Sequence, residues 1–170
     1  MRASRFEYIS AVTLLCLITA PTAVSADGQI STTRDSIARL PSAISHTQVY
    51  STTDGETHFR EVTVALTPIA TAPPAPAAAQ SELQPATTIR HAVFPANWGV
   101  DDRDHAVFHA ASSRRFVTIR SGVMWVKVSD GQTRRFQKGD VIEVLDIAPS
   151  KGHITWVGNE PVVTLLSNHP

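Results

Sequence analysis

Histidine and arginine side chains in the second half of the chain offer the clearest possibilities for chemistry. His105 and His109 lie four residues apart, and three aspartates precede them between positions 101 and 104. Imidazole and carboxylate groups are common ligands of transition metals, and a histidine also donates or accepts protons near neutral pH. Arg115 carries a planar guanidinium, which pairs well with a carboxylate or phosphate.

Several other kinds of function find no support in the sequence. The one cysteine, Cys16, lies in an apolar run near the N-terminus, and the chain has neither a G-x-S-x-G motif nor a Gly-rich phosphate loop. Fifteen Lys and Arg residues balance fifteen Asp and Glu residues, so the formal net charge is zero. Nucleic-acid-binding domains usually carry a basic stripe, and the composition therefore argues against that class of partner.

Residues 1–26 have the pattern of a secretory signal peptide. Arg2 and Arg5 precede the apolar run 9–20, which is shorter than the ~20 residues of a membrane-spanning helix. Small residues then allow cleavage after Ala26. We therefore predict a secreted or periplasmic protein that has no thiol and no stable membrane insertion after cleavage. The alternative is an uncleaved N-terminal anchor.

Two further segments flank or interrupt the predicted domain, which spans residues 46–170. Residues 27–45 are polar, with three apolar residues at helical spacing, although Pro41 interrupts them. We expect a mobile or short-helical N-terminal arm there. Residues 67–85 are rich in Pro and Ala, which indicates a surface connection within the domain.

Alternating apolar and polar residues, separated by glycines, predict strands in the rest of the chain. Asp130-Gly131 predicts a hairpin, because glycine accepts the positive φ of a type I′ turn. Short strands with frequent turns and no helical stretch are typical of an all-β sandwich or barrel. The expected strands cover residues 59–66, 89–94, 115–121, 123–129, 133–136, 140–146, 153–158 and 162–167.

This ordered series resembles the cupin superfamily over about residues 46–169. One strand ends in Gly122, a hairpin turns at Asp130-Gly131, residues 137–140 make the next turn, and Gly152-His153 opens another strand. Further similarities to a cupin-like group with degenerate motifs lie at His58-Phe59, residues 73–76, Phe94-Pro95 and Trp98. The resemblance implies a cupin-type jelly-roll β-barrel.

The resemblance also implies a metal site, which this chain matches only in part. The family's first motif supplies two His and one Glu, and its second motif supplies another His. The Glu position here holds Arg115, and the two His positions fall near His109 and Ala111, whereas His153 matches the second motif. A guanidinium stays protonated and repels a divalent cation, so we expect no metal cofactor. The alternative is a divalent transition metal in a rearranged site of His105, His109 and His153.

Without a metal, the resemblance and the strand alternation together predict an apolar interior with polar groups at one mouth. We expect Arg115, His109 and His153 at that mouth, a common arrangement for a ligand site. The alternatives are a bulge that turns Arg115 outward, and histidines that serve only as turn or solvated residues. The remaining predicted lining residues are Val117, Ile119, Met124, Val126 and Thr155.

Three hypotheses about function follow. The first, favoured by the missing Glu ligand, is an exported binding module for a small anionic or carbonyl-bearing molecule. The second is a metal-dependent oxygenase, isomerase or lyase that uses the rearranged histidines. The third is a metal-free isomerase, cyclase or dehydratase in which His109 or His153 is the general base and Arg115 polarises an oxyanion.

Two tryptophans are expected on the outward side of the predicted strands. Trp125 and Trp156 would form an apolar patch there, and such patches often mark interfaces. We therefore predict a homodimer through the sheet face that carries Trp125 or Trp156. The alternative is that the Pro/Ala-rich connection covers this face.

Overall fold

The computed structural model describes residues 40–69, 71–72, 75–100 and 107–170, and all regular elements in this part are β-strands. The all-β prediction is confirmed, and none of the described segments forms a helix long and apolar enough to cross a membrane. The strands are β1 (Ala43–Ser51), β2 (Thr57–Ala65), β3 (Thr67–Ile69), β4 (Ala78–Gln80), β5 (Thr88–Phe94), β6 (Arg115–Ser121), β7 (Val123–Val128), β8 (Thr133–Gln137), β9 (Val141–Val144), β10 (His153–Val157) and β11 (Val162–Asn168).

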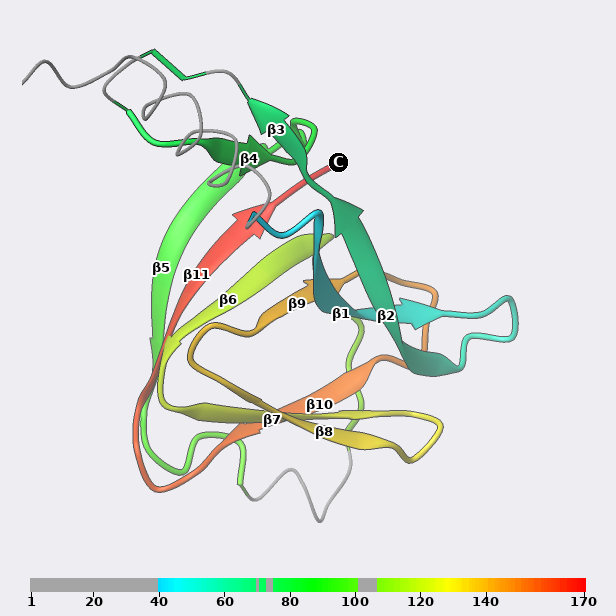
Figure 1. Ribbon diagram of the computed structural model, residues 1–170. Helices are drawn as coiled ribbons and strands as arrows, with labels where there is room; N and C mark the ends of the chain where they lie inside the picture. The colour runs from blue at the N-terminus through cyan, green and yellow to red at the C-terminus, as the bar shows by residue number, and fades with distance from the viewer. Residues whose placement is uncertain (1–39, 70, 73–74, 101–106) are drawn as a thin grey trace, which may run out of the picture.

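Two sheets face each other, and a short ribbon lies beside the larger one (Figure 1). The larger sheet has six strands in the order β2-β1-β9-β6-β11-β5, and the smaller has three in the order β10-β7-β8. β1 and β9 pair in parallel, whereas the other described pairs are antiparallel. The chain passes from the larger sheet to the smaller at Gly122, between β6 and β7.

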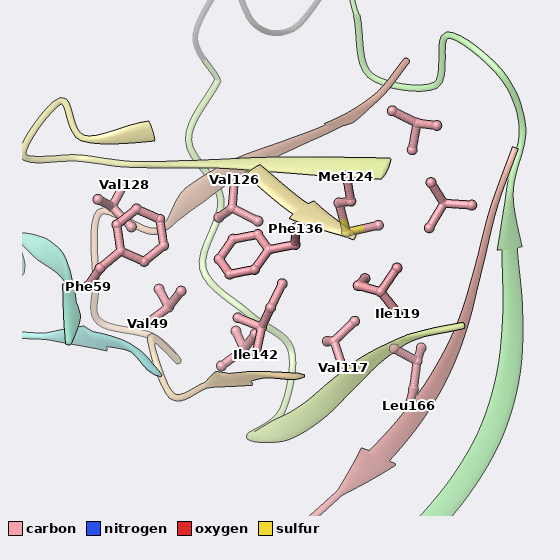
Figure 2. Packing of buried hydrophobic residues seen from close by; sticks show 13 residues of the cluster. Val49, Phe59, Val117, Ile119, Met124, Val126, Val128, Phe136, Ile142 and Leu166 are labelled. Atoms are coloured by element: carbon pink, nitrogen blue, oxygen red, sulfur yellow. The ribbon is translucent and has the colours of Figure 1, made fainter. Parts of the chain in front are cut away.

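The hydrophobic core lies between these sheets (Figure 2). Alternate residues of a strand point to the same face, so β7 places Met124, Val126 and Val128 on the buried side. Val117 and Ile119 of β6 meet them from the larger sheet, together with Ile142 of β9 and others. The core therefore follows the alternation of the sequence.

Two segments differ from expectation. β1 begins at Ala43, inside the predicted arm, and residues 40–45 form a bend and a strand instead of a helix; the rest of the arm lies outside the described residues. Pairing with β2 and β9 fixes this strand, and such tertiary pairing overrides weak local preference. The Pro/Ala-rich connection contains a small ribbon, β3 with β4, whose Pro68 lies in a two-stranded edge that tolerates proline.

Candidate ligand cavity

A cavity of about 310 Å³ lies between the sheets, a volume near the lower limit of ~300–1,000 Å³ for small-molecule pockets. Its walls are mostly apolar side chains from β5, β6, β7, β9 and β11. Its polar side chains come from the segment before β6, from the first residue of β6 and from β10. The lining residues are Phe94, Trp98, His109, Ala110, Ala111, Ser112, Arg115, Val117, Met124, Val126, Ile142, Val144, His153, Thr155 and Leu166.

The residues predicted to line an interior pocket meet around this cavity, with one exception. Arg115, His109 and His153 all line it, as do the predicted apolar residues of β6 and β7 and Thr155 of β10. Ile119 does not: it is only 1% exposed and packs within the hydrophobic core, farther along β6. Arg115 thus faces the interior, and no register shift separates it from Val117.

The imidazole of His153 is paired with a buried carboxylate that the sequence analysis did not select. Nδ1 of His153 lies 2.7 Å from Oδ2 of Asp146, a residue that is 0% exposed. An ionised carboxylate only accepts hydrogen bonds, so an ionised Asp146 would accept this bond from the N–H of Nδ1. Nε2 is the other ring nitrogen of this side chain, which is 10% exposed and lines the cavity.

Backbone contacts hold both members of this pair in place. His109 and His153 form a bridge through two N–H···O bonds of 3.1 and 3.0 Å. Thr57 donates its hydroxyl hydrogen to the carbonyl of Gly152, a buried bond of 2.6 Å, just before His153. The carbonyl of Asp146 accepts from the backbone N–H of Ala111 at 3.1 Å. The direction of the imidazole is thereby fixed by groups from three parts of the chain.

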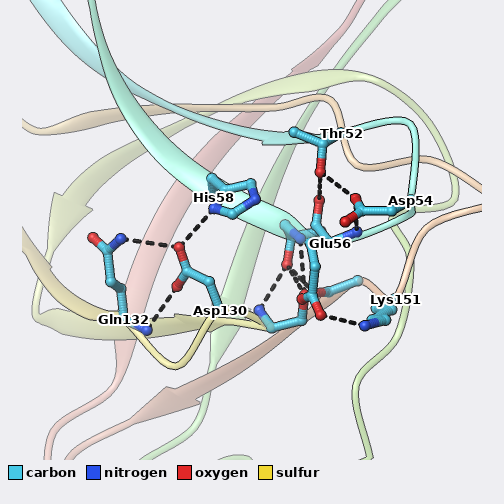
Figure 3. A network of polar contacts seen from close by, with 10 residues as sticks. Thr52, Asp54, Glu56, His58, Asp130, Gln132 and Lys151 are labelled. Carbon is cyan, nitrogen blue, oxygen red and sulfur yellow. Dashed lines mark hydrogen bonds and ion pairs between the residues drawn. The ribbon is translucent and has the colours of Figure 1, made fainter.

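A polar network outside the cavity fixes the loop that leads into β10 (Figure 3). The ammonium of Lys151 and the hydroxyl of Ser129 both donate to the carboxylate of Glu56. These bonds, that of Lys151 first, lower the pKa of Glu56 below its usual value. Lys151 also donates its backbone N–H to the carbonyl of Gly55 at 2.8 Å. The loop between β1 and β2 is thus tied to the residues that precede His153.

Arg115 is oriented by two neighbouring serines. Its Nη2 donates to the hydroxyls of Ser112 and Ser113, at 2.7 and 3.0 Å, and its Nε donates to the carbonyl of Ser113 at 3.2 Å. Partial burial, followed by the positive charge of Arg90, lowers the pKa of Arg115, and the negative charge of Asp146 opposes this shift. Arg115 at the cavity end therefore lies near a buried anion, Asp146, and near Arg90, an exposed cation that does not line the cavity.

The two histidines at this end lie side by side. The ring centroids of His109 and His153 are 4.9 Å apart, with an angle of 57° between the ring planes. His105, the third member of the alternative metal site, lies outside the described residues. Within the residues that are described, no group of three His, Cys, Asp or Glu side chains is placed to hold a metal ion. The rearranged metal site stays a prediction.

Trp125 and Trp156 lie directly opposite each other on β7 and β10. Their ring planes differ by only 3°, with centroids 6.3 Å apart, and both side chains are half-buried instead of fully exposed. The described part of the Pro/Ala-rich connection lies beside the larger sheet, away from this pair (Figure 1). Stacking between the two rings therefore accounts for part of their burial.

Sequence reasoning missed Asp146 and Arg90, and no local signal identifies either of them. Asp146 lies two residues past the end of β9, where the N–H of Ile147 donates to the carbonyl of Leu145, and Arg90 is an exposed residue of β5. A scan against models of known protein families matches none of them, and a search of curated proteins finds no relative of this chain. The resemblance to cupins stays a prediction, and inferences about the cavity rest on its geometry.

Proposed function

We propose that this protein is an exported cupin-type jelly roll that binds a small anionic or carbonyl-bearing molecule in the cavity between its sheets. One observation carries the proposal: Arg115, His109 and His153 converge on a cavity whose other walls are mostly apolar. The two facing sheets, joined at Gly122 between β6 and β7, support the jelly-roll assignment.

Each part of the cavity matches a part of such a ligand. Apolar walls such as Val117, Met124 and Val126 suit a short hydrocarbon group. The guanidinium of Arg115 suits a carboxylate, because its donors match the two carboxylate oxygens. The imidazole of His153 can hydrogen-bond to a carbonyl or hydroxyl group of the same molecule. The small volume favours a ligand with few non-hydrogen atoms.

Titration calorimetry with 4-methyl-2-oxopentanoate, which has a carboxylate, a ketone and a branched alkyl group, tests this proposal. Arg115→Met should weaken binding about 10- to 100-fold, because a hydrogen bond to a charged group contributes ~1.5–3 kcal/mol. Arg114→Met is the matched control: this neighbouring arginine is exposed and does not line the cavity. The neutral ketone 4-methylpentan-2-one should bind weakly to both variants and to the unmodified protein.

A nonspecific effect of removing one positive charge would weaken ligand binding equally in the two variants. Equal affinities for the Arg115→Met and Arg114→Met variants would contradict the assignment of Arg115. Failure of the unmodified protein to bind any small carboxylate or ketone of this size would overturn the proposed function itself. Thermal melting curves of both variants establish that each retains its fold.

A further inference from the structure

Asp146 has an arrangement that packing alone does not explain. The residue is fully buried, yet its Oδ1 has no hydrogen-bond partner among the described residues, and its Oδ2 bonds to His153. Burial of a carboxylate is unfavourable unless the charge is well compensated, so an apolar residue would serve stability better at this position. The geometry is that of a carboxylate that orients an imidazole.

We propose that His153, oriented by Asp146, transfers a proton of a carbonyl compound bound in the cavity and so catalyses its keto–enol interconversion. This inference rests on the proposed function, because it needs such a ligand in the cavity. The substrate class is a small 2-oxo acid with a hydrogen on the carbon next to the ketone. Arg115 holds its carboxylate or the developing enolate oxygen.

The proton and electrons balance without a further reactant. Nε2 of His153 takes the proton from the carbon next to the ketone, and the electron pair of that C–H bond forms the carbon–carbon double bond of the enolate. The π electrons of the ketone move to its oxygen, where the charge of Arg115 stabilises them. The imidazolium then returns the proton to the oxygen, which gives the enol, or to the carbon, which regenerates the ketone.

The surroundings of His153 suit both halves of this cycle. Asp146 accepts a hydrogen bond from the N–H of Nδ1, which selects the tautomer whose Nε2 lone pair is the base, and its negative charge stabilises the imidazolium. The other titratable or charged groups that line the cavity with His153 are His109 and Arg115. Arg115 lies close enough to Asp146 for their charges to interact, so the anion and cation partly compensate each other.

Exchange of the C3 hydrogens of 4-methyl-2-oxopentanoate in deuterium oxide, followed by proton NMR with the full chain, tests the inference. The unmodified protein should accelerate the loss of the C3 signal over buffer, and His153→Gln should abolish the acceleration. Asp146→Asn should reduce the rate about 100-fold while the Kd from calorimetry changes less than threefold. A merely structural role for Asp146 would not separate the rate from the affinity in this way.

Asp130→Asn is the matched control, because Asp130 also contacts a histidine, His58, at 2.8 Å, but outside the cavity. It should leave the exchange rate unchanged. If Asp146→Asn does not fold, nitrogen-15 NMR of the unmodified protein still tests the orientation: a His153 protonated on Nε2 instead of Nδ1 would overturn the inference.

Measuring both binding and hydrogen exchange distinguishes failure of this inference from failure of the proposed function. Binding of the 2-oxo acid without accelerated exchange would overturn proton transfer and leave the proposed function standing. Absence of binding would overturn both. Acceleration that survives in His153→Gln would assign the exchange to another group and likewise refute the inference.

Discussion

Among the described glycines, the closest approach to another backbone segment is at Gly152, where the residue before β10 meets the segment that carries His109. Gly152 has φ of +81°, and a Cβ atom at this position would lie 2.5 Å from the amide nitrogen of Ala110 and closer still to the carbonyl group of His109. These are backbone atoms, which cannot rotate away as a side chain would. The Gly152→Ala variant therefore has to separate the two segments.

Two effects determine how much the Gly152→Ala substitution lowers the free energy of unfolding. A non-glycine residue in the left-handed region costs ~1–2 kcal/mol, and forcing extra atoms into a filled space costs another ~1–3 kcal/mol. Gly131→Ala isolates the first effect, because Gly131 has φ of +93° and a Cβ atom there would meet no other atom within 4 Å. We expect a loss in the free energy of unfolding of about 2–5 kcal/mol for Gly152→Ala and about 1–2 kcal/mol for Gly131→Ala.

Urea denaturation followed by tryptophan fluorescence measures both losses, with the slopes compared to establish that the variants unfold in the same way. Gly152→Ala should also weaken binding of 4-methyl-2-oxopentanoate, because the displaced segment carries His109. Equal losses of stability for the two variants would refute the close approach of the segments and, with it, this account of how His153 is held.

Two further predictions concern pH and assembly. The pKa of Glu56 is lowered first by its bond from Lys151, so the pair stabilises the fold above the unfolded value of about 4.3 and loses this contribution as pH falls through the lower folded value. Lys151→Met should therefore flatten the fall in Tm between about pH 5 and pH 3 in scanning calorimetry; an unchanged slope would contradict the assignment. For assembly, we propose the homodimer through the face of Trp125 and Trp156: light scattering should give twice the chain mass and, for Trp156→Ser, the monomer. A monomeric unmodified protein would refute this interface.

Most strands were predictable because their signals are local. β6 and β7 alternate regularly between polar and apolar residues and are separated by Gly122, and both lie within a residue of their predicted bounds. β1 was not predictable in this way, because Ile44, His46 and Gln48 on one of its faces give no clean apolar alternation. Gln48 is buried by neighbouring strands and by bonds to Arg60 on β2 and to Glu143 on β9, which is distant in the sequence.

Local sequence patterns likewise predict some residues of the cavity and not others. Val117, Met124 and Val126 follow from alternation within single strands. Asp146 does not, because a charged residue at the end of an apolar run usually lies in solvent. Its burial depends on the backbone bond from Ala111 and on His153, neither of which a local pattern contains.

The strand register explains why opposite charges meet at one end of the cavity. β6 and β9 are antiparallel, and Arg115 at the start of β6 pairs with Val144 at the end of β9. Asp146 follows Val144 by two residues and is fully buried, next to the end of the sheet where Arg115 points in. Because the side-chain period is two, a slip of one residue would turn Arg115 outward and leave Asp146 and His153 without the cation. The pairing that builds the core thus also sets the electrostatics on which the proposed binding and proton transfer depend.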